Sequence, residues 1–340
     1  LEKIYRQSDS HFIDILNGVR TNSIQDFHLK ELNKRVDTKF KPKGDDFWIC
    51  LTSTNKQAAE INEIRLKTLK GKIHSYKGKF SGEIDDRSFP TERILSVKKG
   101  AQIMMVSNHT GGEWVNGSIG VVEDLEYDAD SDQDVVVIRL LNDNIIRVTP
   151  YMWDVLRWTY DNKKHSIASE SVGSFTQYPF RLAWAVTIHK SQGKTFDRVI
   201  IDVGPSTFAS GQMYVALSRC RSLEGLVLKH NITKSHILMD RRVVRFMTGF
   251  RYDESEKSLP FVEKMQIIQG AIDAEQKLEI TYLKADDTKS KRIIIPHQVG
   301  EMEYKNKKYT GIEAYCCSQN QPRVFRVDRI LEMKVVGEGE

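Results

Sequence analysis

The stretch that decides the fold is AVTIHKSQGKT, residues 185–195, in which a short apolar run is followed by a polar loop ending in Gly-Lys-Thr. Gly-Lys-Thr also ends the phosphate-binding P-loop, GxxxxGK[ST], where an earlier glycine lets backbone amides face the phosphates. That position holds Ile188, a β-branched residue that resists positive φ. The P-loop pattern occurs nowhere else in the sequence. The stretch is therefore not a P-loop, and its meaning depends on its surroundings.

The surroundings predict an α/β unit with a parallel sheet. Apolar strand-like runs cover residues 47–51, 181–188, 198–203 and 225–229. One helix is predicted after Thr54 or Asn55, both good N-cap residues, and another at about 206–219. Strands and helices that alternate at this spacing favour parallel pairing. The carboxyl ends of such strands form the crevice where α/β sheets bind ligands.

Two further units are predicted. Residues 95–178 contain short β-like runs and the turn signal Asn116-Gly117, which indicates a small all-β unit inserted into the α/β unit. A charged linker is expected at 251–261. Beyond it, an amphipathic helix and four strand-like runs predict a separate small antiparallel barrel or sheet over residues 262–340.

Composition and charge narrow the class of protein. The net charge is +5, but between Asp161 and Arg251 there are 14 lysines and arginines against 6 acidic residues, which fits a polyanion site or a solvated basic face equally well. The four cysteines form neither a CxxC pair nor a disulfide framework, so a reducing, cytoplasmic location is expected. No apolar run reaches about 18 residues, and no membrane partner is expected. The chain starts at Leu1 without a signal peptide, so we expect a piece of a longer protein.

Arg219 ends the predicted helix 206–219, away from the apolar face formed by Met213, Ala216 and Leu217. We therefore expect Arg219 to lie outside the core. An isolated arginine at this place often only complements the helix dipole. Here it follows a loop rich in polar side chains, residues 189–194, and both would line one crevice of the sheet.

Five segments together resemble one family, the superfamily 1 DNA helicases of the Pif and RecD type, which move 5′ to 3′. Residues 183–203 resemble motif V and residues 211–228 resemble motif VI. Residues 4–20 resemble the motif IV region, 51–62 the segment after it, and 97–122 the start of an inserted β-domain. The resemblance implies an ATP-dependent DNA helicase with two RecA-like domains, active in repair, recombination or replication. ATP and Mg²⁺ would be bound mainly by the first domain, which carries the P-loop.

The same resemblance implies an organisation and a set of roles. Residues 1–94 and 179–250 would be the second RecA-like domain, with an SH3-like β-domain inserted at 95–178. Arg6 and Arg219 would act as arginine fingers, and Gln192, Gly193 and Lys194 would lie near the nucleotide. Single-stranded DNA would be held by Thr54, Asn55, Thr187, His189, Lys190 and Ser191. These residues alone are not expected to hydrolyse ATP.

Several of these residues also have simpler interpretations. Thr54 and Asn55 taken alone are helix caps, and a lone histidine such as His189 is more often a surface or packed residue. Three tryptophans of the inserted unit could stack on DNA bases or could be core residues: Trp114, Trp153 and Trp158. The alternative functions are a non-catalytic nucleic-acid-binding module and a ligand-sensing regulator, although we find no helix-turn-helix for the latter.

Residues 262–340 resemble a WYL domain, a small Sm-like or SH3-like β-barrel. The Trp-Tyr-Leu of that family stands here as Thr310, Gly311 and Ile312. The resemblance implies a site for a phosphate-containing ligand or nucleic acid at Arg292, Arg326 and Arg329. From residue 260 onward 13 basic residues balance 13 acidic ones, and a purely structural or protein-contact role is an open alternative.

Overall fold

A computed structural model describes residues 7, 9–21, 24–43, 46–82, 89–161, 165–204, 209–284, 289–304 and 306–336. The chain forms two compact units. The first consists of Leu1–Leu16 and Gln25–Ile237, and the second of Asn17–Ile24 and Leu238–Glu340. No helix in the described part of the chain is long and apolar enough to cross a membrane.

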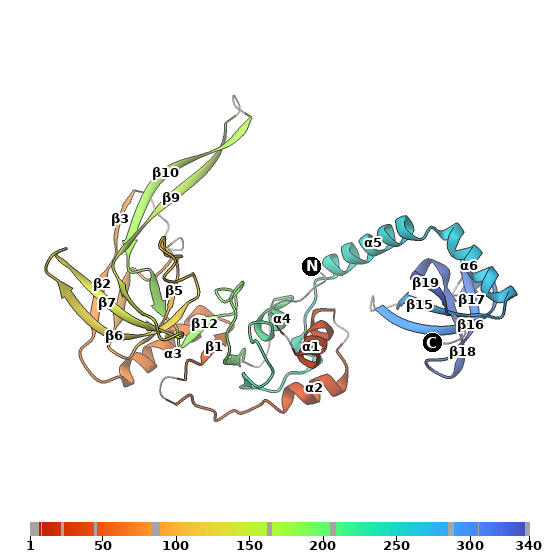
Figure 1. Cartoon of the computed structure of the whole chain (residues 1–340), viewed down its shortest axis with the longest axis horizontal. Coiled ribbons are helices and arrows are strands. Elements are labelled where there is room, and N and C mark those ends of the chain that lie inside the picture. Colours follow the sequence, from red (N-terminus) through yellow and green to blue (C-terminus); the bar gives the residue numbers. More distant parts are fainter. Residues whose placement is uncertain are drawn as a thin grey trace. The chain divides into compact units, whose positions relative to one another are not determined.

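The first unit contains the predicted parallel sheet (Figure 1). Its strand order is β12-β1-β13-β14, and every pairing is parallel. These strands are β1 (Ile49–Thr52), β12 (Ala185–Thr187), β13 (Val199–Asp202) and β14 (Leu226–Leu228). Helix α3 (Asn55–Thr68) packs on the sheet through Ala58, which joins a buried cluster with Cys50 and Ile200. Helices α2 (Asp26–Asn33) and α4 (Gln212–Leu217) and the first residues of α1 (Ser10–Arg20), up to Leu16, complete the helical part of this unit.

The run predicted as one strand, 181–188, is divided between two sheets. β11 (Phe180–Leu182) pairs antiparallel with β5 (Gln102–Met105), whereas β12 pairs with β1. The chain is held at the crossing point by Gln102, whose Nε2 donates to the Ala183 carbonyl at 2.8 Å. Because the run is apolar apart from Arg181 and Thr187, its pattern could not show where one sheet ends and the next begins.

The predicted helix 206–219 is shorter in the structure. α4 covers only Gln212–Leu217, with Gly211 as a left-handed N-cap at φ 76°. Residues 205–208 lie outside the described part of the chain. Glycine is suited to this left-handed cap because it has no Cβ.

The inserted β-unit is larger than the predicted range 95–178. Its main sheet has the order β11-β5-β6-β7-β8, and two smaller sheets have the orders β3-β10-β9 and β2-β4. The strands not yet given are β2 (His74–Lys77), β3 (Lys79–Gly82), β4 (Ile94–Val97), β6 (Ile119–Asp128), β7 (Gln133–Leu140), β8 (Ile145–Val148), β9 (Tyr151–Asp161) and β10 (Ser166–Gln177). Strands from both sides of the predicted range therefore contribute, and one buried cluster that includes Leu95, Ile103 and Phe180 joins them.

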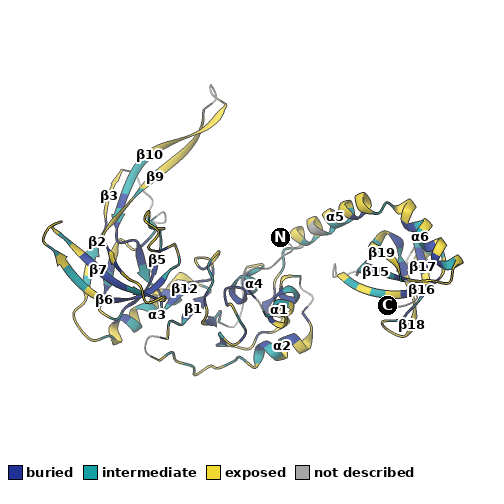
Figure 2. Ribbon diagram, in the orientation of Figure 1, coloured by how far each residue is buried: buried dark blue, intermediate teal, exposed yellow. Residues whose placement is uncertain are grey.

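The second unit is built from α5 (Arg241–Ser258), α6 (Phe261–Asp273) and a five-stranded antiparallel sheet. The sheet order is β18-β17-β16-β15-β19, with β15 (Lys277–Leu283), β16 (Lys289–Tyr304), β17 (Lys307–Cys316), β18 (Gln321–Arg326) and β19 (Ile330–Val336). The last predicted run forms two strands because a short 3₁₀ turn, Val327–Arg329, interrupts it. Figure 2 shows the buried residues gathered between α6 and the sheet.

The prediction of a linker at 251–261 was wrong, because most of this segment is helical. Residues up to Ser258 continue α5, and Ser255 is buried, with its hydroxyl donating to the Leu331 carbonyl at 2.8 Å. The segment is charged because it is the solvated face of a helix, and one polar residue fixes that helix to β19. The apolar face of α6 is largely as its spacing indicates, since Ile268 is buried and Met265 and Ile272 pack against the core, whereas Val262 is 66% exposed and Lys264 is buried.

Candidate nucleotide and DNA site

The site begins where two parallel strands end side by side. Thr52 of β1 is opposite Thr187 of β12, and the Ile188 amide donates to the Thr52 carbonyl at 3.0 Å. The start of α3 and the loop of residues 188–194 therefore lie at the same edge of the sheet. Thr54 caps α3, since its Oγ1 accepts from the Gln57 amide at 3.2 Å. Thr54 therefore caps the helix and also lies at the edge of the sheet where the crevice was expected.

The motif V loop is a tight turn built around Ser191. The Ser191 amide donates to the carbonyls of Thr187 and Ile188, and its hydroxyl donates to the Ile188 carbonyl at 2.6 Å. Ser191 is fully buried and Thr187 is 6% exposed. These two side chains hold the loop together, and their contact with DNA stays a prediction.

Four of the six predicted DNA-binding residues remain accessible. Thr54, Asn55, His189 and Lys190 are all exposed. The pKa of Lys190 is lowered by partial burial of its ammonium group and by the positive charge of Arg181. Arg181 lies on β11, and its Nη2 donates to the Pro90 carbonyl. The Lys190 and Arg181 charges lie close enough to repel each other, and an anion such as a phosphate would relieve this repulsion.

Arg219 joins motif VI to motif V. Its Nη1 donates to the Lys194 carbonyl at 2.9 Å, its Nε to the Val215 carbonyl at 2.9 Å and its Nη2 to Ser218 Oγ at 2.9 Å. Arg219 is only 6% exposed, so the expectation that it lies outside the core was wrong. The side chain turns back over the end of α4 because the backbone leaves the helix after Leu217. The bond to Val215 is the helix-end role, and the bond to Lys194 places the guanidinium at the motif V loop.

Backbone bonds and one buried glutamine hold Arg219 in this position. The Phe196 amide donates to the Arg219 carbonyl at 2.9 Å, and the Arg221 amide donates to the Phe196 carbonyl at 3.1 Å. Gln7 donates through Nε2 to the carbonyls of Ser218 and Cys220, at 3.1 and 2.9 Å. Gln7 follows Arg6, the other predicted finger, which itself lies outside the described residues. Sequence reasoning missed Gln7, since no local pattern marks a glutamine that will be buried.

The three residues expected near the nucleotide differ in their surroundings. Gln192 and Gly193 are exposed, and Gly193 has φ 80° with open space where a Cβ would stand. Lys194 points elsewhere, because its Nζ donates to Asn116 Oδ1 of the β-insert at 2.6 Å. Gln192 and Gly193 are therefore available to a ligand, whereas the Lys194 ammonium already has a protein partner.

The three tryptophans of the insert differ in how far they are exposed. Trp114 is 8% exposed and stacks on His109, with ring centroids 4.1 Å apart. Trp153 is half-buried against Phe175. Trp158 is 66% exposed on the β9–β10 hairpin, which extends from the insert in Figure 1. Only Trp158 is therefore placed to stack on a base without unfolding the insert.

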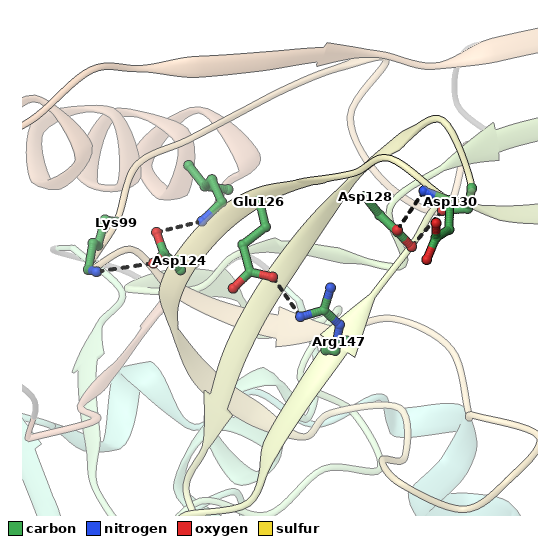
Figure 3. A network of polar contacts seen from close by, with 8 residues as sticks. Lys99, Asp124, Glu126, Asp128, Asp130 and Arg147 are labelled. Carbon is green, nitrogen blue, oxygen red and sulfur yellow. Dashed lines mark hydrogen bonds and ion pairs between the residues drawn. The ribbon is translucent and has the colours of Figure 1, made fainter.

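The outer face of the insert carries paired charges. Figure 3 shows Asp124 next to Lys99 and Glu126 next to Arg147, at 3.6 and 2.6 Å. The pKa of Asp128 is lowered, chiefly because its carboxylate accepts a hydrogen bond from Ser131. Carboxylates dominate this face, so it is a poor surface for DNA phosphates.

The three arginines of the predicted WYL site differ in their surroundings. Arg326 donates from Nε and Nη2 to both carboxylate oxygens of Asp328, at 3.0 and 2.6 Å. Arg292 is opposite Ile280 on β15, whereas Arg326 is opposite Gly311 on β17. Arg329 lies in the 3₁₀ turn and is half-buried. The charge of Arg326 is thus largely balanced within the unit, and the role of the three arginines stays a prediction.

Family comparisons match the two parts of the chain separately. A family model described as the UvrD-like helicase C-terminal domain matches residues 182–227, and one described as the WYL domain matches residues 263–335. Among the parts of the chain that the structure describes, no group of three or more His, Cys, Asp or Glu could hold a metal ion.

Relatives and solved structures agree with the helicase match. The chain is 34% identical to the ATP-dependent DNA helicase PIF1 of Homo sapiens over 262 residues, which is 75% of this chain and 38% of that protein. It is similar to Bacteroides Pif1 in complex with ADP-AlF4, with 34% identity and a TM-score of 0.63 over 74% of this chain and 56% of that one. Bacteroides Pif1 bound to single-stranded DNA gives 33% identity and a TM-score of 0.55 over 76% and 55%. The chain thus spans little more than half, or less, of the proteins it resembles.

Proposed function

We propose that this chain, which is similar to the C-terminal portion of Pif1 helicases and matches a WYL domain model, supplies the second motor domain of an ATP-dependent DNA helicase. The enzyme would move along single-stranded DNA, unwind duplex at junctions and serve repair, recombination or replication in the cytoplasm. The observation that carries the proposal is the bond between Arg219 and the Lys194 carbonyl, which brings the motif V loop and the predicted finger into one place.

DNA would be held at the carboxyl edge of the parallel sheet. His189 and Lys190 are exposed there, and the first amides of α3 lie beside them at Thr54 and Asn55. Helix N-termini and lysines bind phosphates without reading sequence, so weak and nonspecific binding of single-stranded DNA is expected. The single-stranded DNA complex of a similar protein supports this assignment.

This chain would contact ATP only on the side that faces away from the P-loop domain. The donors of this chain, the Arg219 guanidinium with the Gln192 amide and the Gly193 backbone, suit phosphate oxygens. Mg²⁺ and most of the nucleotide would be held by the P-loop domain of the whole protein, and these 340 residues alone would not hydrolyse ATP. Arg219 would exchange its bond with the Lys194 carbonyl for the γ-phosphate, where its charge offsets the charge that develops during transfer.

The test uses the protein that joins this chain to its P-loop domain. Steady-state ATP hydrolysis is measured against DNA concentration, with nucleotide affinity measured separately. Arg219→Ala is expected to lower the rate about 10³- to 10⁵-fold, as loss of an arginine finger does, with nucleotide affinity nearly unchanged. Arg221→Ala is the matched control, because this neighbouring arginine pairs only with the exposed Asp197 at 3.0 Å. Near-parental hydrolysis by Arg219→Ala would remove the motor assignment.

The DNA-binding part is tested by His189→Ala and Lys190→Ala. Both should weaken single-stranded DNA binding and raise the DNA concentration needed for half-maximal ATPase, with the maximal rate recovered at high DNA. Affinity should fall as salt rises, because phosphate contacts release counterions. Salt-independent binding would argue against an electrostatic site. A parent protein that binds DNA but shows no ATP hydrolysis at any DNA concentration would instead be a non-catalytic binding module.

We also propose that Arg292, Arg326 and Arg329 of the WYL unit bind a phosphate-containing ligand or nucleic acid. Arg326 would have to leave Asp328 to do so, which argues for a switchable rather than a preformed site. The measurement is single-stranded DNA binding by the whole chain with all three arginines replaced by glutamine. Unchanged binding would leave them a structural role.

A further inference from the structure

One lysine connects the motif V loop to the β-insert. The Lys194 Nζ donates to Asn116 Oδ1 at 2.6 Å. The stem of the same side chain packs on the next residue, since a Cβ added to Gly117 would lie 3.2 Å from Lys194 Cγ and Cδ. Gly117 also has φ 103°, which favours glycine. The turn is thus shaped to receive this side chain.

The turn that receives Lys194 is anchored to the insert. The Asn116 amide donates to Asn108 Oδ1 at 2.8 Å, and the Gly117 amide donates to the Met105 carbonyl at 2.9 Å. Met105 is the last residue of β5, which lies between β11 and β6 in the main insert sheet. The Met105 side chain is fully buried. A displacement of the insert would therefore carry Asn116 with it.

The backbone of the same lysine contacts the predicted finger. The Lys194 carbonyl accepts from Arg219 Nη1 at 2.9 Å, and the Lys194 amide donates to the Ser191 carbonyl at 3.1 Å. Lys194 therefore contacts the insert through its side chain and Arg219 through its backbone. Partial burial of the ammonium, together with the positive charge of Arg181, lowers the pKa of Lys194.

We propose that Lys194 is a positioning residue that transmits the position of the β-insert to Arg219. DNA bound along the sheet edge and the insert would fix the position of Asn116. Through its bond to Asn116, Lys194 would then fix the position of its own carbonyl, which accepts from Arg219. The link makes hydrolysis depend on DNA. This inference rests on the proposed helicase function, but the contact itself is tested independently.

The contact is tested first in this chain, by a double-mutant cycle of thermal unfolding. Lys194→Met keeps the stem and removes the ammonium, and Asn116→Ala removes the acceptor. Each is expected to lower the melting temperature of the first unit by about 2–4 °C, with the double variant no lower than the worse single one. Lys99→Met is the control, since it removes a lysine of the insert that pairs only with exposed Asp124. Additive shifts would show that Lys194 and Asn116 are not linked.

The coupling is tested in the protein that includes the P-loop domain. Lys194→Met and Asn116→Ala are both expected to lower the DNA-saturated ATPase about 10- to 100-fold, because a small misplacement of a catalytic group has effects of this size. The DNA concentration for half-maximal ATPase and the nucleotide affinity should stay near parental values, unlike those of a DNA ligand or nucleotide ligand. Asn116→Asp keeps an oxygen acceptor and should restore the rate.

The outcomes separate this inference from the proposed function. A normal rate for Asn116→Ala with an impaired Lys194→Met would mean that Lys194 acts at the nucleotide and not through the insert. If both variants are normal while Arg219→Ala is inactive, the coupling is wrong and the finger assignment stands. A fully active Arg219→Ala removes the proposed function itself.

Discussion

At the residue scale, Arg219 shows how two interpretations of one side chain can both hold. Its Nε bond to Val215 is the helix-end contact of an ordinary arginine, and its Nη1 bond to Lys194 is the contact that a finger residue needs in order to reach the crevice. Sequence reasoning placed Arg219 at the right loop but predicted exposure. Helical geometry beyond Leu217 could not be assumed, because the helix ends there and the side chain turns inward.

Arg219→Ala should also destabilise the first unit of this chain by about 1–3 kcal/mol, because it removes the Arg219 donor to the part-buried Lys194 carbonyl and one of the two side-chain donors to the Val215 carbonyl. Arg219→Lys should recover only part of this, since one ammonium cannot replace a planar fork that serves three acceptors. Denaturant unfolding measures the change. Arg221→Ala, an exposed ion pair, is expected to cost about 0–1 kcal/mol. Equal effects of the two alanine substitutions would contradict the structural role.

Polar side chains set the limit of sequence prediction at this scale. The crevice set was found because Thr187–Lys194 follows an apolar strand, and His189 and Lys190 are indeed accessible. The buried position of Ser191 was not foreseen, since a hydroxyl that bonds to the carbonyl three residues back looks the same in sequence as one that faces a ligand. Gln7 depended on a contact across more than 200 residues, which no local pattern reveals.

At the element scale, the parallel sheet was predicted well because its strands are short, largely apolar and alternate with loops and helices at a spacing typical of parallel pairing. All three pairings, β12 with β1, β1 with β13 and β13 with β14, are parallel as expected. Boundaries were less predictable. The run 181–188 serves two sheets, and only the tertiary bond from Gln102 marks the division.

The entry to β14 provides a sharp test of this packing. A Cβ at Gly225 would lie 1.9 Å from the Asp197 carbonyl oxygen, a backbone atom that cannot move alone. Gly225→Ala should therefore destabilise the first unit by about 1–3 kcal/mol through overpacking. Gly249→Ala is the matched control, because this glycine of α5 has nothing within 4 Å of its Cβ position and alanine favours helices by about 0.5–1 kcal/mol. Thermal unfolding that ranked the two variants in the opposite order would contradict the packing.

The β9–β10 hairpin carries an exposed face whose role can be separated from folding. Trp158, Tyr160 and Ile167 are 66%, 58% and 71% exposed, and Tyr160 is opposite Ile167. Trp158→Ala should leave stability within about 0.5 kcal/mol and weaken single-stranded DNA binding by about 1–3 kcal/mol if a base stacks there. Trp114→Ala should instead cost about 3–5 kcal/mol of stability. Fluorescence titration and unfolding of both variants are the measurements, and unchanged DNA affinity in Trp158→Ala would exclude stacking.

At the scale of the whole molecule, the chain was predicted to consist of a motor region and a separate C-terminal unit, and the structure has two compact units. The boundary could not be predicted, because α5 is rich in charge and resembles a linker in composition. Ser255 and Lys264 show how α5 packs with the second unit. Lys264 Nζ donates to Ser255 Oγ at 2.9 Å, and Ser255 Oγ donates to the Leu331 carbonyl.

Through these hydrogen bonds, α5 contributes to the stability of the second unit. Residues 241–340 are expected to fold cooperatively, whereas 260–340 should be less stable, because removal of Ser255 leaves the buried Lys264 ammonium without that acceptor. Lys264→Met should restore much of the loss, since it keeps the stem and removes the charge. Equal unfolding midpoints for the two lengths would show that α5 is a linker after all.

The same lysine predicts a pH dependence with a definite sign. Burial lowers the pKa of Lys264 in the folded unit below its value in the unfolded chain, so the unfolded state binds more protons between those two pKa values. The stability of residues 241–340 should therefore rise with pH as the solution passes through the folded pKa, and the gain should be complete above the unfolded pKa. Lys264→Met cannot release this proton and should lack that increment. Denaturant unfolding of both proteins from pH 7 to 10 gives the difference, which isolates Lys264 because every other titrating group is shared. A difference that stays constant over this range would mean that Lys264 keeps an ordinary pKa, and that the ammonium at Ser255 is better solvated than its 3% exposure indicates.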